Sequence, residues 1–340
     1  MNALTLALFV AAWVPEGPAP KFAITDQGIT CEASGYGNWL RTDREYENVR
    51  LKFDYQLARW SEAAVVLRAP RVGKPMRTGV PIMLAHDFHE KVTPHVTGAL
   101  AGIAPPTKWP GASFGQWHKV EITLIERRLH VWIDGVEVQD TLVPEERLFR
   151  GYILFPDLGH RYQIRNVEIE PLAAVTSYRD LETVEWSPRP GNTAQWTRRD
   201  GLIRGEKGDG ILYASPTFLD FDLTLAVKSI GHVNGGVFLR GTPEGYRGFE
   251  VQVYSPPDAV YPTGSIYGVK RAQVDVEYEE QWFLMQIRLR GATCKVWLDG
   301  RLVAETDQLP AEAQKPGRVG IQMHSTGTAI EVKDVRLRPF

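Results

Sequence analysis

The sequence predicts an all-β protein made of two tandem β-sandwich domains of the jelly-roll kind. Three observations support this prediction: an internal repeat, runs in which apolar and polar residues alternate, and Asp-Gly pairs that lie between such runs. Alternation is typical of half-buried antiparallel strands, and Asp-Gly tolerates the positive φ angles of a two-residue hairpin turn. The architecture therefore follows from pattern alone.

The repeat divides the chain into two copies of one domain. Leu-Arg at 67–68 recurs at 239–240 in a similar apolar context. A Trp followed by a Val-Trp-Ile/Leu-Asp-Gly run also occurs twice, as Trp117 with residues 131–135 and as Trp282 with residues 296–300. Each copy has the length of an ordinary domain. We predict a first domain over residues 1–172 and a second over residues 173–340.

The strands can be placed in chain order from the alternating runs. In the first copy they cover residues 49–55 and 120–124, with a hairpin turn at Asp134-Gly135, and residues 164–169 end the copy. The second copy repeats this with strands at residues 221–225, 249–254, 287–290, 319–324 and 330–337 and a turn at Asp299-Gly300.

The N-terminus has two interpretations. Residues 4–13 are apolar, as in the core of a signal peptide, but neither Lys nor Arg precedes them and the stretch is too short to span a bilayer. We favour a first strand over residues 8–14, followed by a loop. A membrane span is not expected.

Composition excludes some functions. The net charge of −2, with both signs scattered along the chain, provides no basic stripe, so we do not expect nucleic-acid binding. Cys31 and Cys294 do not occupy corresponding positions in the two copies. Two buried thiols are therefore expected rather than a disulfide framework or a Cys-based metal site.

Strand parity locates a candidate site in the second copy. Residues two apart on a strand share a face, so the apolar residues of the 249–254 strand leave the residues between them on the opposite face. By this argument one sheet face collects Arg240, Glu250, Gln252, Tyr254, Ser265, Tyr267, Gln322 and His324.

At these residues the sequence resembles the 3-keto-disaccharide hydrolase family, whose domains are also described as 3-keto-glucoside lyases and 3-keto-2-hydroxy-glucal hydratases. The matching stretches are Asn-Gly-Gly-Val-Phe-Leu-Arg at 234–240, Phe-Glu-Val-Gln at 249–252, Thr-Gly-Ser-Ile-Tyr-Gly at 263–268, Trp282, and Ile-Gln-Met-His at 321–324. The resemblance implies a concanavalin A-like jelly roll. It also implies a periplasmic or secreted protein.

The first copy keeps the scaffold of this family but departs at the chemistry. It has Leu-Arg at 67–68, Thr-Gly at 97–98 and Trp117. Its counterpart of the Glu-Val-Gln strand, residues 81–84, has neither Glu nor Gln, Ala101 replaces the Tyr, and residues 155–158 lack both Gln and His. We expect the active site in the second copy, with the first copy as a structural or sugar-binding companion.

The resemblance implies cleavage of the glycosidic bond of a 3-keto-disaccharide or 3-keto-glucoside, by hydrolysis or by elimination and hydration through an enolate. Such chemistry needs a base, an enolate stabiliser and an acid. Glu250 and His324 are the candidates for base and acid in either order, Arg240 and Gln252 for oxyanion stabilisation, and Tyr267 for sugar binding or proton relay. The remaining candidate substrate contacts are Asn234, Tyr254, Gln322 and Trp282, although an aromatic residue such as Trp282 also commonly fills a sandwich core.

Two other functions compete with this one. A conventional glycoside hydrolase needs two carboxylates that flank the scissile bond, and the Glu-x-Asp-x-x-Glu strand of jelly-roll glucanases does not occur in the sequence. A non-catalytic carbohydrate-binding protein is the main alternative. It would not need a convergent acid and base.

No cofactor is expected, although a divalent metal is compatible with Glu250 and His324. A second metal hypothesis concerns the His-Asp-Phe-His-Glu cluster at 86–90, with His95 nearby. Its spacing is not that of a helical zinc site, so a solvated loop is the simpler interpretation.

Overall fold

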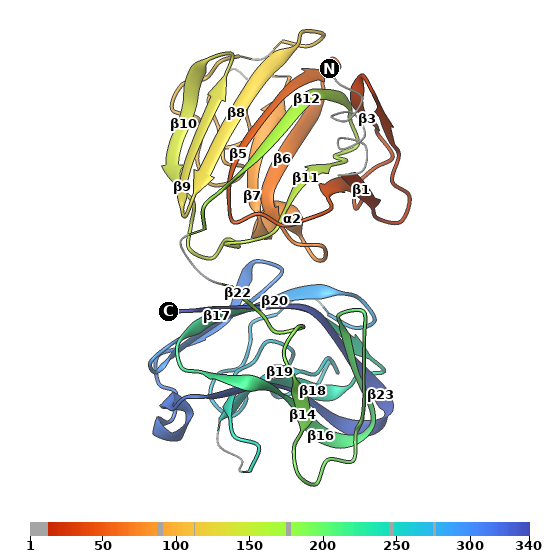
Figure 1. Cartoon of the computed structure of the whole chain (residues 1–340), viewed down its shortest axis with the longest axis vertical. Coiled ribbons are helices and arrows are strands. Elements are labelled where there is room, and N and C mark those ends of the chain that lie inside the picture. Colours follow the sequence, from red (N-terminus) through yellow and green to blue (C-terminus); the bar gives the residue numbers. More distant parts are fainter. Residues whose placement is uncertain (1–12, 87–90, 112, 175–177, 245–247, 275–276) are drawn as a thin grey trace. The chain divides into compact units, whose positions relative to one another are not determined.

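The computed structural model describes residues 13–86, 91–111, 113–174, 178–244, 248–274 and 277–340. The chain forms two compact units, of which one contains residues 1–71 and 75–175 and the other residues 72–74 and 176–340. Each unit is a β-sandwich with its own hydrophobic core (Figure 1). The predicted fold class, two all-β sandwich domains of the concanavalin A-like kind, is confirmed.

The first unit packs a sheet of five strands against a sheet of seven. The five-stranded sheet has the order β1 (Trp13–Glu16), β4 (Trp39–Thr42), β11 (Tyr152–Pro156), β6 (Glu62–Ala69), β7 (Val80–Ala85). The seven-stranded sheet has the order β10 (Val136–Leu142), β9 (Arg128–Ile133), β8 (His118–Ile125), β5 (Asn48–Leu57), β12 (Arg161–Leu172), β3 (Gly28–Glu32), β2 (Phe22–Thr25). A single helical turn, α2 (Pro75–Thr78), precedes β7. Of the first strand predicted at residues 8–14, residues 8–12 lie outside the described part of the chain.

The second unit repeats this arrangement with longer strands that belong to both layers. Its eleven-stranded sheet follows the order β14 (Trp186–Pro188), β16 (Leu202–Phe218), β23 (Gly317–Pro339), β17 (Phe221–Ile230), β20 (Phe283–Arg290), β21 (Thr293–Leu298), β22 (Arg301–Thr306). Strands off this path are β13 (Arg179–Asp180), β15 (Gln195–Arg199), β18 (Asn234–Gly241) and β19 (Phe249–Val253), and η1 (Ala311–Gln314) is a 3₁₀ turn.

The long strand β23, blue in Figure 1, connects the two layers of the second unit. Its residues 318–324 pair with β18, and residues 329–339 pair with β17. The first stretch therefore lies in a layer with β18, β19 and the second half of β16, and the later stretch in a layer with β17, β20, β21 and β22. The candidate site lies on the first of these layers.

The cores use the apolar residues that alternation predicts. In the second unit Phe249, Val251 and Val253 of β19 pack in one cluster with residues of both layers. Cys31 and Cys294 are buried free thiols in the two separate cores, as predicted. No helix among the described residues is long and apolar enough to cross a membrane.

Candidate functional site

A polar cluster lies on the outer face of the layer formed by β18, β19 and the first part of β23. Glu250 and Gln252 alternate with the core residues of β19, and both are more than nine-tenths buried although they face away from the core. The register pairs Gly236 of β18 with Gln252 on one side and with Gln322 of β23 on the other. The parity prediction therefore holds for Glu250, Gln252 and Gln322.

Glu250 is the strongest electrostatic feature of this cluster. Burial raises its pKa from 4.5 to about 8, because a carboxylate loses its hydration away from water. With its amide nitrogen turned toward the carboxyl group, Gln322 donates a hydrogen bond to Glu250 (Nε2 to Oε2, 3.0 Å). In the opposite orientation the amide oxygen can accept a hydrogen bond from the O–H group of neutral Glu250. The pair can thus accommodate both protonation states.

Gly236 provides the space into which the Glu250 carboxyl group fits. A Cβ at this position would collide with the carboxylate and lie 2.6 Å from the Val251 carbonyl oxygen. Any side chain at position 236 would therefore have to displace the carboxyl group. This lack of space explains the Gly of the Asn-x-Gly part of the sequence motif.

Gln252 and Asn234 form the adjoining part of the cluster. Gln252 donates from Nε2 to Asn234 Oδ1 at 2.8 Å, whereas its own Oε1 is buried without a hydrogen-bond partner among the described residues. Buried polar atoms are normally satisfied, so this oxygen is suited to accept a hydrogen bond from a ligand hydroxyl. Asn234 pairs across the sheet with His324.

His324 lies at the end of the same face and is largely exposed. Its Nδ1 is 2.9 Å from Asp209 Oδ1, and Asp209 lies opposite it on β16. His324 is two strands and four residues away from Glu250 in the register, which corresponds to roughly 16 Å between the Cα atoms for ordinary strand spacings. The two residues therefore lie on one sheet face without facing each other across neighbouring strands.

Tyr267 lies beside Glu250 on a short segment that extends the sheet past β19. Its backbone N–H donates to the Glu250 carbonyl oxygen (2.9 Å), and Gln252 N–H donates to the Ser265 carbonyl oxygen (2.9 Å). The Tyr267 side chain is 56% exposed, and its ring centroid is 5.2 Å from that of Tyr261. Tyr254 is half-buried at the end of β19. Both predicted tyrosines therefore border the cluster.

Arg240, by contrast, is not part of the cluster. Its buried guanidinium donates to the backbone carbonyls of Leu219, Gly291 and Ala313 and pairs with Asp220 at 3.1 Å. The parity argument fails here because the register shifts between Phe238 and Gly241 and Arg240 has a φ of 51°, so a bulge turns the side chain away. Arg68, also with a φ of 51°, binds the Glu47 carbonyl in the first unit.

Trp282 also lies outside the cluster. It immediately precedes β20, in the other layer, and the Lys333 ammonium lies 4.2 Å from its ring centroid. In the first unit Arg165 lies over Trp117 in the same way, at 3.9 Å. The repeated Trp is therefore a scaffold residue with a stacked cation, and the structure does not support its prediction as a substrate contact.

The first unit carries apolar residues where the second carries the cluster. The registers of β6 with β7 and of β11 with β4 and β6 provide the correspondence. Glu250 corresponds to Pro81, Gln252 to Met83 and Tyr267 to Ala101. In the same way Gln322 corresponds to Pro156 and His324 to Leu158. Met83, Ala101 and Leu158 pack together in one small apolar cluster. At these five described positions the first unit has neither an acid nor a base.

Sequence reasoning missed two features of the site. Asp209 lies in a glycine-rich stretch without alternation, so no pattern connects it with His324. An apolar group next to the polar cluster, made of Ile211, Tyr213 and Phe238, was also not foreseen. Together these residues give the face one polar and one apolar half.

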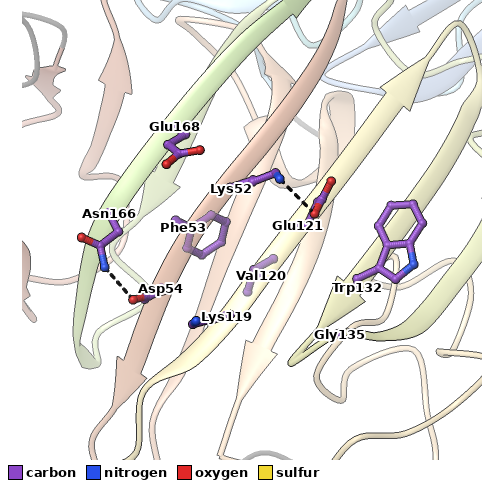
Figure 2. Close-up of a pocket in the computed structure, with 10 residues that line it drawn as sticks. All are labelled: Lys52, Phe53, Asp54, Lys119, Val120, Glu121, Trp132, Gly135, Asn166 and Glu168. Carbon is purple, nitrogen blue, oxygen red and sulfur yellow. Dashed lines mark hydrogen bonds and ion pairs between the residues drawn. The ribbon is translucent and has the colours of Figure 1, made fainter.

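A hollow of about 720 Å³ lies on the outer face of the seven-stranded sheet of the first unit (Figure 2). Lys52 pairs there with Glu121 at 3.3 Å, and Asn166 donates to Asp54 at 2.8 Å, while Trp132 stands at one side. Because these polar groups already bind one another, the hollow offers less to a ligand than the polar cluster does.

Two metal hypotheses concern the His-Asp-Phe-His-Glu cluster at 86–90 and the pair Glu250 and His324. Of the His-Asp-Phe-His-Glu cluster, residues 87–90 lie outside the described part of the chain. Within the part that is described, no group of three or more His, Cys, Asp or Glu side chains could hold a metal ion.

Comparison with known proteins adds the family. The model of the 3-keto-alpha-glucoside-1,2-lyase-like domain matches residues 8–170 and again residues 179–338. No curated protein matches the sequence significantly.

Several solved structures resemble about half of the chain. One candidate glycosyl hydrolase of Parabacteroides distasonis ATCC 8503 is 16% identical with a TM-score of 0.43, over 49% of this chain and 93% of its own. A second from the same organism is 22% identical with a TM-score of 0.39, over 46% and 100%. A carbohydrate-binding module of Bacillus subtilis, CBM66, is 15% identical with a TM-score of 0.32, over 49% and 99%. The two family matches together cover most of the sequence, and the chain therefore belongs to the family of 3-keto-alpha-glucoside-1,2-lyase-like domains, which it contains in two tandem copies.

Proposed function

We propose that the second unit cleaves the glycosidic bond of a 3-keto-disaccharide or 3-keto-glucoside through an enolate. The observation that carries this proposal is Glu250, a buried carboxyl group with a pKa of about 8 beside the amides of Gln252 and Gln322. A proton-transfer group works best when its pKa is near the working pH. Family membership supports the same class of substrate.

In the proposed reaction Glu250 is the base. Its carboxylate removes the hydrogen from C2, which the neighbouring C3 carbonyl makes acidic, and the electron pair forms the enolate. The enolate then collapses to a C1–C2 double bond, and the C1–oxygen bond breaks. Addition of water to this double bond returns a 3-keto monosaccharide, so that the sum of both steps is hydrolysis.

The amides position the base and the sugar in this proposal. The Gln322 amide faces Glu250 in either orientation, and Gln252 is held by Asn234, so both amides are positioned before the substrate arrives. The unpartnered Oε1 of Gln252 accepts a hydrogen bond from a sugar hydroxyl. Tyr267 and Tyr254 border the sugar.

His324 is the proposed acid for the leaving oxygen. Asp209 Oδ1 lies 2.9 Å from His324 Nδ1, which leaves Nε2 of the ring for the substrate. Both groups project from one sheet face, so in this proposal the substrate lies along that face with its C2 at Glu250 and its leaving oxygen at His324.

Two other functions remain to be compared. Burial alone raises the pKa of Glu250, with no contribution from a second carboxylate, which argues against the paired acids of a conventional glycoside hydrolase. Burial of a carboxyl group costs free energy, because the group loses its contact with water. A non-catalytic sugar-binding protein would gain nothing in return for this cost.

The experiment is to incubate the full-length protein with a 3-keto-disaccharide deuterated at C2 and with the unoxidised parent sugar, with and without chelator. We expect release of a 3-keto monosaccharide from the keto sugar alone, with loss of deuterium to water. Cleavage that retains the deuterium would contradict the enolate route. Binding without cleavage would make the protein a sugar-recognition protein, and loss of activity with chelator would add a metal to the mechanism.

A further inference from the structure

An exposed aromatic group lies at one end of the first unit, where the β5–β6 turn meets the segments after β7 and before β8. It consists of Trp60 (54% exposed), Phe114 (46% exposed) and His86, whose ring lies edge-on to both at 5.3 and 5.0 Å. The Arg59 guanidinium lies 5.2 Å from the Trp60 ring centroid and 5.8 Å from that of Phe114. We call these four residues the aromatic platform.

The backbone holds this platform in place. Trp60 has a φ of 62°, an unfavourable conformation for a bulky residue, and its N–H donates to His86 Nδ1 at 3.0 Å. The His86 N–H donates to the Ser61 carbonyl (2.8 Å), and the Gly115 N–H donates to the Leu57 carbonyl (2.9 Å). All three segments are therefore connected, and the rings face water on a preformed support.

The second unit provides an internal comparison, because it has the same turn without the platform. His232 occupies the place of Trp60, seven residues before the repeated Leu-Arg, and it also has a positive φ of 56°. Glu279 occupies the place of Phe114, three residues before the repeated Trp, and its Oε1 accepts a hydrogen bond from the His232 N–H at 2.9 Å. The turn is thus common to both copies, whereas among the described residues the exposed Trp and Phe rings occur at it in the first copy alone.

We propose that the aromatic platform of the first unit is a binding site for the pyranose rings of an unoxidised glycan. The flat C–H face of a pyranose can stack on Trp60 and Phe114, and Arg59 and His86 supply polar groups for the hydroxyls. Two exposed rings beside the polar groups of Arg59 and His86 match a pyranose, which has flat C–H faces and hydroxyl groups along its edge. The choice of a glycan as the occupant rests on the function proposed for the second unit.

In this proposal the first unit binds a glycan and the second unit carries out the reaction. The first lacks the polar cluster, with Pro81 and Met83 in place of Glu250 and Gln252, and carries the platform. The second has kept the polar cluster. Binding of the chain to a glycan would raise the local concentration of the catalytic unit where its substrates are produced.

The test uses the full-length protein in native gels that contain soluble β-glucan, α-glucan or xylan, and titration with the corresponding hexasaccharides. We expect retardation by at least one of these glycans and at least tenfold weaker binding in Trp60→Ala and Phe114→Ala. Tyr36→Ala is the matched control, because Tyr36 is 78% exposed in the same unit outside the platform, and it should bind as the wild type does. Turnover of a soluble 3-keto-disaccharide should be unchanged in all three variants.

Trp60→Gly separates a lost contact from a damaged fold. Glycine adopts positive φ without strain, so this variant should raise the melting temperature while it loses binding. Wild-type protein that binds none of the glycans, or binding that survives both aromatic substitutions, would overturn the proposal. Glycan binding without turnover of keto sugars would contradict the proposed function and leave the platform in place.

Discussion

Burial gives Glu250 a proton affinity that an exposed carboxyl group does not have. Its pKa rises from 4.5 to about 8, so between these values the unfolded chain loses a proton that the folded chain keeps. The contribution of Glu250 to the free energy of unfolding is fully present below pH 4.5 and is lost as the pH rises through 8. Between these pH values it falls by up to about 1.4 kcal/mol per pH unit. At neutral pH the carboxyl group therefore opposes folding.

Glu250→Gln should remove this pH dependence, because the amide is neutral at every pH. We expect the variant to exceed the wild type in free energy of unfolding at pH 8.5, and the difference to shrink at pH 5. Urea unfolding at both pH values measures it. A difference that is the same at pH 5 and pH 8.5 would contradict a raised pKa.

The same residue sets the pH dependence of the proposed reaction. As a base Glu250 must be ionised, so kcat/KM for a 3-keto-disaccharide should rise with pH and level off above about 8. Glu250→Gln should lower the rate by at least about 100-fold, the usual contribution of such a group. A rate that falls through this range would instead assign Glu250 as the acid.

His324 is exposed and bound to Asp209, so its substitution tests chemistry rather than folding. His324→Ala should lower turnover by at least about 100-fold while the free energy of unfolding changes by less than about 0.5 kcal/mol. Asp209→Asn, which keeps the size of the side chain, should give a smaller loss. Full activity of His324→Ala would remove His324 from the mechanism.

The element that sequence parity misjudged is the end of β18. Arg240 donates to three backbone carbonyls from inside the second unit, and removal of its side chain takes away their donor, with Ala313 the buried residue among the three. Arg240→Ala should lower the free energy of unfolding by roughly 1.5–3 kcal/mol, as expected for the loss of hydrogen bonds from a charged group. Activity below the melting temperature should persist.

Arg68→Ala in the first unit is the matched control for this substitution, because Arg68 ends β6 at the same positive φ. It should destabilise the first unit in the same way and leave turnover of keto sugars intact. Loss of activity in correctly folded Arg240→Ala protein would show instead that Arg240 takes part in the reaction.

Alternation predicted the strands and one face of β19 well, because burial fixes a period of two wherever a strand is regular. Glu250, Gln252 and Gln322 were found in this way. Alternation could not predict the bulge at Arg240 or the layer to which Trp282 belongs, because both depend on pairing between distant strands. Asp209 was missed for the same reason: its only link to the site is the register of β16 with β23.

At the scale of the whole molecule, the two copies share a scaffold but not a site. The repeated Arg and Trp residues hold the sandwiches together, whereas the residues of the polar cluster occur in the second copy only. Both copies of the repeat therefore form the fold, but only the second carries the proposed active site.

This asymmetry predicts one keto-sugar site per chain. Titration of Glu250→Gln protein with a 3-keto-disaccharide, followed by calorimetry, should give a stoichiometry near one, because the apolar face around Met83 and Leu158 offers no hydrogen bonds to a sugar. Gln252→Met, which gives the second copy the residue of the first, should abolish this binding by removing the amide that contacts Asn234. A stoichiometry near two would mean that the first unit binds the keto sugar without the polar cluster, and the site would then have to be sought in the scaffold that both copies share.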